Sequence, residues 1–105
     1  MAENPKIAPS QSIELVENYF SANFKEFNLL KKNHYTGYWW VEYINTSGDV
    51  RVVFDGDIGG HFSVKIFIAD TEYSLWRFDR SVNKATLSTK ENILYQLGIL
   101  KKFIT

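Results

Sequence analysis

The stretch YTGYWWVEYINTSGDVRVVFDGDIGGHFSVKIFIADTEYSLWRF, residues 35–78, decides the fold. Runs rich in aromatic and β-branched residues alternate within it with turns rich in Asp, Gly, Asn and Ser. Such runs suit the pleated, half-buried surface of a sheet, and short turns join neighbouring antiparallel strands. We therefore predict an antiparallel meander of four strands, over residues 35–44, 50–54, 62–68 and 73–78.

The third predicted strand has the clearest pattern. Phe62, Val64 and Ile66 alternate there with Ser63 and Lys65, which indicates one buried face. The first strand has no such alternation, because Tyr38 and Trp40 fall on one side while Trp39, Val41 and Tyr43 fall on the other. Two arrangements explain apolar residues on both sides: the sheet lies between two helices, or an aromatic patch faces a partner or a second subunit.

A helix is predicted on each side of the meander. Ile13, Val16, Phe20, Phe24 and Phe27 recur at three- and four-residue spacing, which predicts a helix over residues 10–31 with Ser10 as its N-cap. Ser88 and Glu91 have the spacing of a capping box, and they precede the apolar residues Ile93, Leu94, Leu97, Leu100 and Ile104. The predicted fold class is therefore α+β, with an N-terminal helix, the sheet, and a C-terminal helix packed on the sheet.

Length and composition indicate one domain, residues 1–105, in which we expect residues 1–9 to be flexible. The chain has no cysteine, which excludes disulfides and thiolate metal sites. Residues 1–9 show no signal-peptide pattern, and no run approaches the roughly 18 apolar residues of a membrane span. We expect a cytoplasmic protein without membrane contact.

Catalytic and metal-binding patterns are weak. His34 and His61 have no neighbouring Ser or Cys arrangement that would indicate a triad. Asp55 and Asp57 resemble the opening of a calcium loop, but the third ligand and the closing glutamate are missing from the sequence. Glu42 is the one acid within an aromatic strand, and it could pair with Arg51 or Arg77 across the sheet. We predict no enzyme, no metal and no cofactor.

The charges are unevenly distributed, although the formal net charge is zero. Residues 42–79 hold seven acids and three bases, a balance of minus four, whereas residues 80–105 hold five bases and one acid, a balance of plus four. Sheets that stack nucleic-acid bases carry Arg and Lys among their aromatic residues to follow the phosphates. The acidic sheet region therefore argues against nucleic-acid binding.

The layout resembles a known class of small bacterial proteins. A cysteine-free domain with a leading helix, an aromatic meander that begins with Trp39, Trp40, Val41, Glu42 and Tyr43, acidic turns and a closing helix resembles immunity proteins of polymorphic toxin systems, in particular the contact-dependent growth inhibition type. The resemblance covers residues 10–104. It implies a cytoplasmic, non-catalytic protein that binds the C-terminal domain of a cognate toxin, commonly a nuclease, and covers its active site.

Candidate contact residues follow from what such a partner presents. A nuclease has a basic cleft, so acids would speed association and aromatic anchors would exclude water. The candidate acids are Asp49, Asp55, Asp57, Asp70, Glu72 and Asp79, and the candidate anchors are Trp39, Tyr43, Trp76 and Phe78. Alternate turns of a meander lie at opposite ends of a sheet, so these acids cannot all share one contact.

Two other classes of function remain open. A small-ligand binding module or small enzyme would need a closed apolar pocket with convergent polar groups, for which Glu42, His61 and Arg77 are the candidates. A homodimer could use the aromatic face of the sheet instead.

Overall fold

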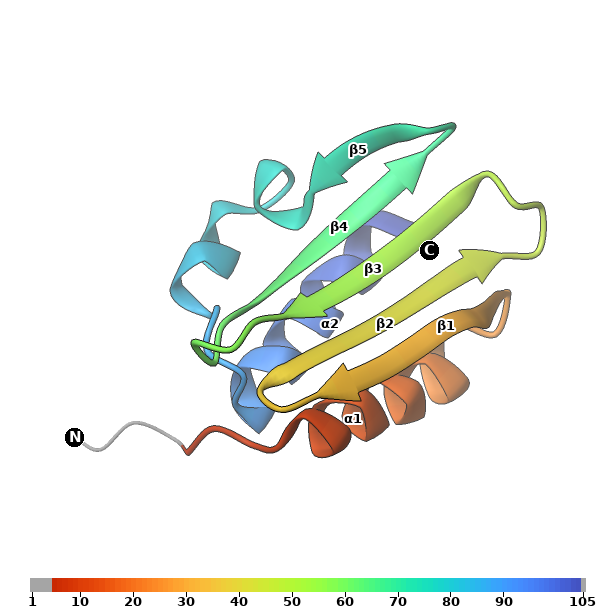
Figure 1. The fold of residues 1–105 in the computed structure, drawn as a ribbon. Coiled ribbons are helices and arrows are strands. Elements are labelled where there is room, and N and C mark those ends of the chain that lie inside the picture. Colours follow the sequence, from red (N-terminus) through yellow and green to blue (C-terminus); the bar gives the residue numbers. More distant parts are fainter. Residues whose placement is uncertain (1–4, 105) are drawn as a thin grey trace.

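The computed structural model describes residues 5–104 and has an α+β fold. Its elements are α1 (Pro9–Asn23), β1 (Phe27–Tyr35), β2 (Tyr38–Asn45), β3 (Val50–Gly56), β4 (Phe62–Ile68), β5 (Thr71–Ser74), the 3-10 helices η1 (Leu75–Arg77) and η2 (Arg80–Lys84), and α2 (Lys90–Ile104). The strands form one antiparallel sheet in the order β1-β2-β3-β4-β5. The predicted helix–meander–helix order is confirmed, with five strands instead of four (Figure 1).

The additional strand is β1, which begins within the segment that we predicted as the end of the first helix and continues past residue 31. The helix ends at Asn23, because Phe24 takes a non-helical backbone conformation with φ −126° and ψ 64°. Phe20, Phe24 and Phe27 still pack together across this turn, with ring centroids 4.5 to 6.0 Å apart. Their spacing matched a helix, but the last of them lies at the start of a strand.

Two tight turns set the strand boundaries. Tyr35 pairs with Tyr38, so β1 and β2 are joined by two residues, and Gly37 has φ +82°. Ile68 likewise pairs with Thr71. The two residues between them, Ala69 and Asp70, both have positive φ, as the central residues of a type I′ hairpin turn do. The predicted strand over residues 73–78 is therefore wrong in its second half: β5 ends at Ser74 and the chain turns into η1.

The helix starts differ from the predicted caps. The N-cap of α1 is Ala8, whose N–H donates to Gln11 Oε1 at 3.0 Å, and Pro9 takes the first helical position. At α2 the hydroxyl of Thr89 accepts from Asn92 N at 3.1 Å. Ser88, the predicted cap, is buried and accepts from Trp39 Nε1 at 3.4 Å. Each helix thus begins within two residues of its predicted position.

The predicted flexible segment, residues 1–9, lies partly outside the described residues. Of the part that is described, Ile7 N donates to Ser88 O at 2.9 Å, and Lys6 forms an isolated bridge with Thr89. These contacts attach the segment before α1 to the segment before α2.

Both helices lie on the same face of the sheet, as Figure 1 shows. They run in the same direction, because Ile7 N before α1 donates to Ser88 O before α2, and at the far ends Lys101 Nζ of α2 donates to Asn23 Oδ1 of α1 at 2.9 Å. The core between the helices and the sheet takes one side of the central strands, namely Trp39, Val41 and Tyr43 of β2, Val52 and Phe54 of β3, and Phe62, Val64 and Ile66 of β4. The arrangement with a helix on each face is therefore wrong, and one face of the sheet has no helix from residues 5–104 over it.

Candidate partner-binding surface

The face of the sheet turned away from the helices is here called the open face. Side chains alternate across a strand, so the residues between the core positions point to it. They are Asn28, Lys31, Asn33 and Tyr35 of β1, Tyr38, Trp40, Glu42 and Ile44 of β2, Arg51, Val53 and Asp55 of β3, Ser63, Lys65 and Phe67 of β4, and Glu72 of β5. The open face is thus mixed, with both signs of charge and several aromatic rings.

Four of these residues, Trp40, Glu42, Arg51 and Phe67, are linked into a row that we call the Glu42 cluster. Glu42 accepts a hydrogen bond from Trp40 Nε1 at 3.3 Å and one from Arg51 Nη1 at 2.5 Å. The Arg51 guanidinium carbon in turn lies 4.3 Å from the centre of the Phe67 ring, at cation–π distance. The row crosses three strands, and each side chain is fixed by its neighbour.

The Glu42 cluster also shields the centre of the open face. Glu42 is only 7% exposed, and Val53, which pairs with it across the strands, is 2% exposed although no helix within residues 5–104 covers it. A carboxylate taken this far out of water needs a charged or hydrogen-bonding partner, which Arg51 and Trp40 supply. The pairing of Glu42 with Arg51, one of the two partners that the sequence offered, is confirmed.

Two tyrosines stand beside this cluster. Tyr38 is 46% exposed and Tyr35 is 70% exposed, and they pair with each other at the turn between β1 and β2. Neither tyrosine was a candidate anchor in the sequence analysis. The sequence does not show which aromatic residues of this strand are exposed, because both sides of residues 38–43 are apolar. Only the position of the helices decides which side belongs to the core.

The predicted aromatic anchors fall into two groups. Trp39 and Tyr43 are buried in the core, 3% and 6% exposed, which corrects the expectation that they contact a partner. Tyr43 stacks on Phe20 at 3.9 Å between ring centroids, and Trp39 packs on Phe54 and Phe62. Trp76 and Phe78 are exposed, but they belong to η1 and the residue after it, beyond the β5 edge. Phe78 there contacts Phe103 of α2, with ring centroids 5.0 Å apart.

The six predicted acids do not form one patch. Asp49 and Asp70 lie in turns at one end of the sheet, where Ala69 N donates to Asp49 O at 3.0 Å, and Glu72 follows in β5. Asp55 and Asp57 lie at the opposite end, as we predicted from the meander. Asp79 comes after η1. By strand alternation only Asp55 and Glu72 share the open face with the Glu42 cluster.

In two of these acids, Asp49 and Asp79, local hydrogen bonds lower the pKa of the carboxyl group. Asp49 accepts from Ser47 Oγ at 2.5 Å and from Asn45 Nδ2 at 2.9 Å, and these hydrogen bonds lower the pKa of its carboxyl group. Asp79 caps η2 by accepting from the side chain and backbone of Ser81, which lowers its pKa in the same way. Both carboxylates therefore order their own turns.

The candidate ligand-binding residues do not converge. Glu42 is held by Trp40 and Arg51 in the middle of the sheet, whereas His61 Nδ1 lies 2.9 Å from Thr86 Oγ1 at the start of β4. Arg77 belongs to η1 and lies over Trp76 at 5.9 Å. Within residues 5–104 there is also no group of three His, Asp or Glu side chains that could hold a metal ion. Nothing in this geometry favours the small-ligand alternative.

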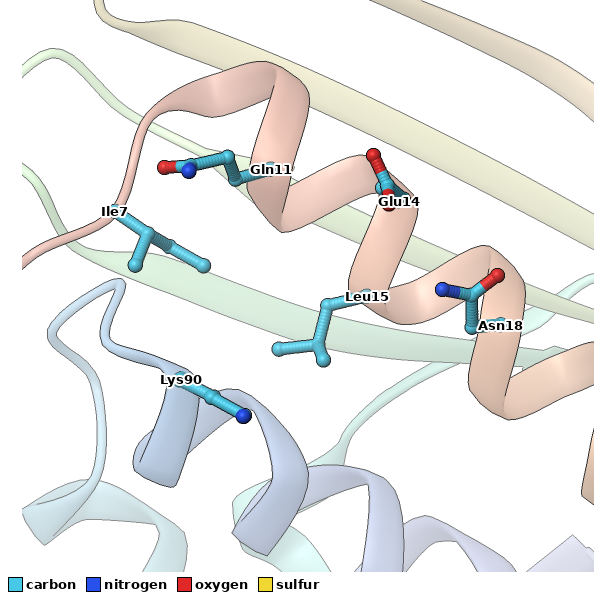
Figure 2. Close-up of a pocket in the computed structure, with 6 residues that line it drawn as sticks. All are labelled: Ile7, Gln11, Glu14, Leu15, Asn18 and Lys90. Atoms are coloured by element: carbon cyan, nitrogen blue, oxygen red, sulfur yellow. The ribbon is translucent and has the colours of Figure 1, made fainter.

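Two hollows lie beside α1. One, of about 330 Å³, is formed by the segment before α1, by α1 and by the start of α2 (Figure 2). Its lining mixes Ile7 and Leu15 with the polar ends of Gln11, Glu14, Asn18 and Lys90. The other, of about 420 Å³, runs between α1 and β1 and is called the α1–β1 groove. Both are open to solvent.

Comparisons with protein-family models, with curated proteins and with solved structures gave no match for this chain. Among the described residues no helix is long and apolar enough to cross a membrane. Function is therefore inferred from the geometry of this chain alone.

Proposed function

We propose that the chain is a non-catalytic, cytoplasmic immunity protein that binds and neutralises a cognate toxin domain through the open face of its sheet. The observation that carries the proposal is the Glu42 cluster, in which Trp40, Arg51 and Phe67 are fixed around one nearly buried carboxylate. Trp, Tyr and Arg dominate the energetics of protein–protein contacts. Here they occupy a sheet face that no described helix covers.

The fixed positions of the Trp40 and Arg51 side chains lower the entropic cost of binding a partner. Ordering a flexible side chain costs about 0.5–1.5 kcal/mol on association, and a side chain already held by neighbours avoids most of this cost. Arg51 and Trp40 are held in this way by Glu42. Tyr35 and Tyr38, which stand beside them, supply exposed aromatic area to exclude water from the contact.

The open face carries Glu42, Asp55 and Glu72 together with Lys31, Arg51 and Lys65, so its charges balance, and a basic cleft such as that of a nuclease would contact its acids only. Asp55 and Glu72 lie on either side of the Glu42 cluster, and they are the acids that we assign to this contact. Charges at the edge of an interface mainly raise the association rate and make it depend on salt. Asp49, Asp57, Asp70 and Asp79 lie in turns outside the open face, so they contribute through the long-range field only.

A pull-down with three baits tests the proposal. The tagged wild-type chain, a Tyr35→Ala/Tyr38→Ala variant and a Trp76→Ala variant are incubated with lysate of the source cells, and the bound proteins are quantified by mass spectrometry. We expect one stoichiometric partner that the wild type and Trp76→Ala retain and the double variant loses. Trp76→Ala is the matched control, because it removes an exposed aromatic residue away from the open face.

The captured domain must then be a toxin. Expressed alone in a bacterial host it should arrest growth, and co-expression of the wild-type chain, but not of the Tyr35→Ala/Tyr38→Ala variant, should restore growth. Degradation of nucleic acid by the purified domain, blocked by the chain, would identify it as a nuclease. A partner that the double variant retains and Trp76→Ala loses would move the contact to η1, and a non-toxic partner would rule out the immunity role.

A further inference from the structure

A small cavity of about 80 Å³ lies at the edge of β4, and we call it the Gln96 slot after the residue of α2 that lines it. β5 ends at Ser74, which pairs with Lys65, so within residues 5–104 only η1 and η2 lie beside residues 62–64 on this side. The segment after η2 is attached to the start of β4, because Phe62 N donates to Thr86 O at 2.7 Å. The slot is the space that the short strand β5 leaves between β4, the two 3-10 helices and α2.

Gln96 brings a hydrogen-bond acceptor without a partner to this slot. The residue is 2% exposed, and its Nε2 donates to Ala85 O at 2.7 Å. Because a backbone carbonyl only accepts, the group that faces Ala85 must be the NH₂, and the other terminal atom is the amide oxygen. This oxygen accepts no hydrogen bond from residues 5–104. No fully buried polar side-chain atom of these residues lacks a partner, so the oxygen must be accessible, and the slot is the cavity that Gln96 lines.

Three more polar side chains of the slot have no partner among residues 5–104. They are Ser63, Ser74 and Asn83, and all three line the slot. Hydroxyl and amide groups donate as well as accept, whereas the oxygen of Gln96 only accepts. Among the described residues the lining contains no Asp, Glu, Lys, Arg or His. The slot therefore offers donors and acceptors but no charge.

The lining and the volume together define what the slot binds. An ion would lose its hydration shell without gaining a counter-charge, which is costly. Pockets that enclose whole metabolites measure roughly 300–1,000 Å³, whereas about 80 Å³ is room for two or three water molecules at about 30 Å³ each. A primary carboxamide group is of this size, is uncharged, and has both an N–H donor and a carbonyl acceptor. It therefore complements the slot.

We infer that the Gln96 slot binds an uncharged primary carboxamide, which belongs either to a small free amide or to an Asn or Gln side chain of another molecule. The N–H of the ligand donates to Gln96 Oε1, and its carbonyl oxygen accepts from the side chains of Ser63, Ser74 or Asn83. The slot shares no residue with the Glu42 cluster. The inference does not depend on the identity of a toxin.

Titration of the wild-type chain with acetamide, followed in two-dimensional NMR spectra of the amide groups, tests the inference. We expect the side-chain amide signals of Gln96 and Asn83 to shift and to saturate. Acetone has nearly the same shape but no N–H, and acetate carries a charge. Each should bind about tenfold more weakly, because one hydrogen bond contributes up to about a factor of ten in affinity.

Two larger probes distinguish the two sources of the carboxamide. The N-acetyl, N-methylamide derivative of asparagine presents the group on an amino-acid residue, and the matching derivative of aspartate replaces it with a carboxylate. If the asparagine derivative binds at least as tightly as acetamide and the aspartate derivative does not, the slot takes a side chain of another molecule. If acetamide alone binds, the slot takes a small free amide.

Two variants and one control locate the bound amide. Gln96→Met removes the accepting oxygen but keeps an unbranched side chain, and Asn83→Leu replaces a polar group of the slot at an exposed position. Each should weaken acetamide binding about tenfold. Gln96→Met should leave acetone binding unchanged, whereas a mere disturbance of packing would weaken both. Asn18→Leu makes the same exchange as Asn83→Leu at an exposed position of α1 and should change neither affinity. Urea unfolding checks that all three variants fold, and Asn83→Leu carries the result if Gln96→Met does not.

Two outcomes would overturn the inference. The first is that acetamide, acetone and acetate all give shifts that grow without saturation, because the slot would then hold solvent only. The second is that folded Gln96→Met or Asn83→Leu binds acetamide as tightly as the wild type.

Discussion

Arg51 Nη1 lies 2.5 Å from Glu42 Oε2 on the face of the sheet opposite the helices. The side chain of Glu42 is about one-tenth exposed and that of Arg51 about one-third exposed, so the pair is neither a buried nor a surface ion pair. Its geometry depends on two further contacts, the Trp40 indole on the carboxylate and the Phe67 ring under the guanidinium. The pair therefore serves both the stability of the sheet and the shape of the proposed contact surface.

Replacing only one residue of this ion pair should lower the free energy of unfolding more than replacing both residues. Arg51→Met keeps an unbranched apolar side chain at this position but leaves the Glu42 carboxylate without its cation, which should lower the free energy of unfolding by about 1–3 kcal/mol. Glu42→Gln/Arg51→Met should recover part of this loss, since the amide needs no cation. Urea unfolding of the wild type, both single variants and the double variant gives the coupling energy. Additive single effects would show that the pair contributes nothing beyond its separate residues.

At Gly56 the backbone of β3 lies directly against the side chain of Trp39. A Cβ at this position would lie 1.9 Å from Trp39 Nε1, and the Trp39 indole is buried and hydrogen-bonded to Ser88. Gly56→Ala should therefore lower the free energy of unfolding by at least about 2 kcal/mol, as overpacking of a core does.

Gly98, inside α2, is the matched control for Gly56. A Cβ there would meet no atom within 4 Å. Gly98→Ala should raise the free energy of unfolding by about 0.5–1 kcal/mol, because alanine loses less backbone freedom in a helix. Urea midpoints measure both changes. A neutral Gly56→Ala would mean that Trp39 has room to move, which would contradict the packing described here.

The sequence predicts best the strands in which apolar and polar residues alternate, so that only one side of the strand is apolar. In β4, Phe62, Val64 and Ile66 alternate with polar residues, and the structure buries these three. β1 could not be found in this way, since its sequence FNLLKKNHY has no alternation and most of its side chains are exposed. The aromatic spacing from Phe20 to Phe27 continues the helical pattern, so the predicted helix extends to residue 31, into the first half of the strand.

The candidate surface was predictable only in part for a related reason. Trp39 and Trp40 are equally apolar neighbours, and which of them is core depends on which face the helices cover. That choice is made by contacts between α1, α2 and the sheet, which no local pattern encodes. The pairing of Glu42 with an arginine was accessible from the strand order, whereas the stacking of Arg51 on Phe67 required the register of β3 and β4.

The burial of the Tyr43 side chain predicts how the free energy of unfolding changes at alkaline pH. Burial raises the pKa of the Tyr43 hydroxyl from its ordinary value of 10.0 to about 12, and the nearby Glu17 carboxylate adds to the rise. Because the folded state holds the proton more tightly than the unfolded state, this stabilisation is complete below pH 10 and is lost as the pH rises through about 12. Tyr43→Phe keeps the stacking on Phe20 but cannot ionise, so its stability should fall less than that of the wild type over this range. Urea midpoints at about pH 8 and about pH 11 measure the difference. Tyr35→Phe, which changes an exposed tyrosine, should follow the wild type, and a Tyr43→Phe variant that does so too would show that Tyr43 ionises without disturbing the core.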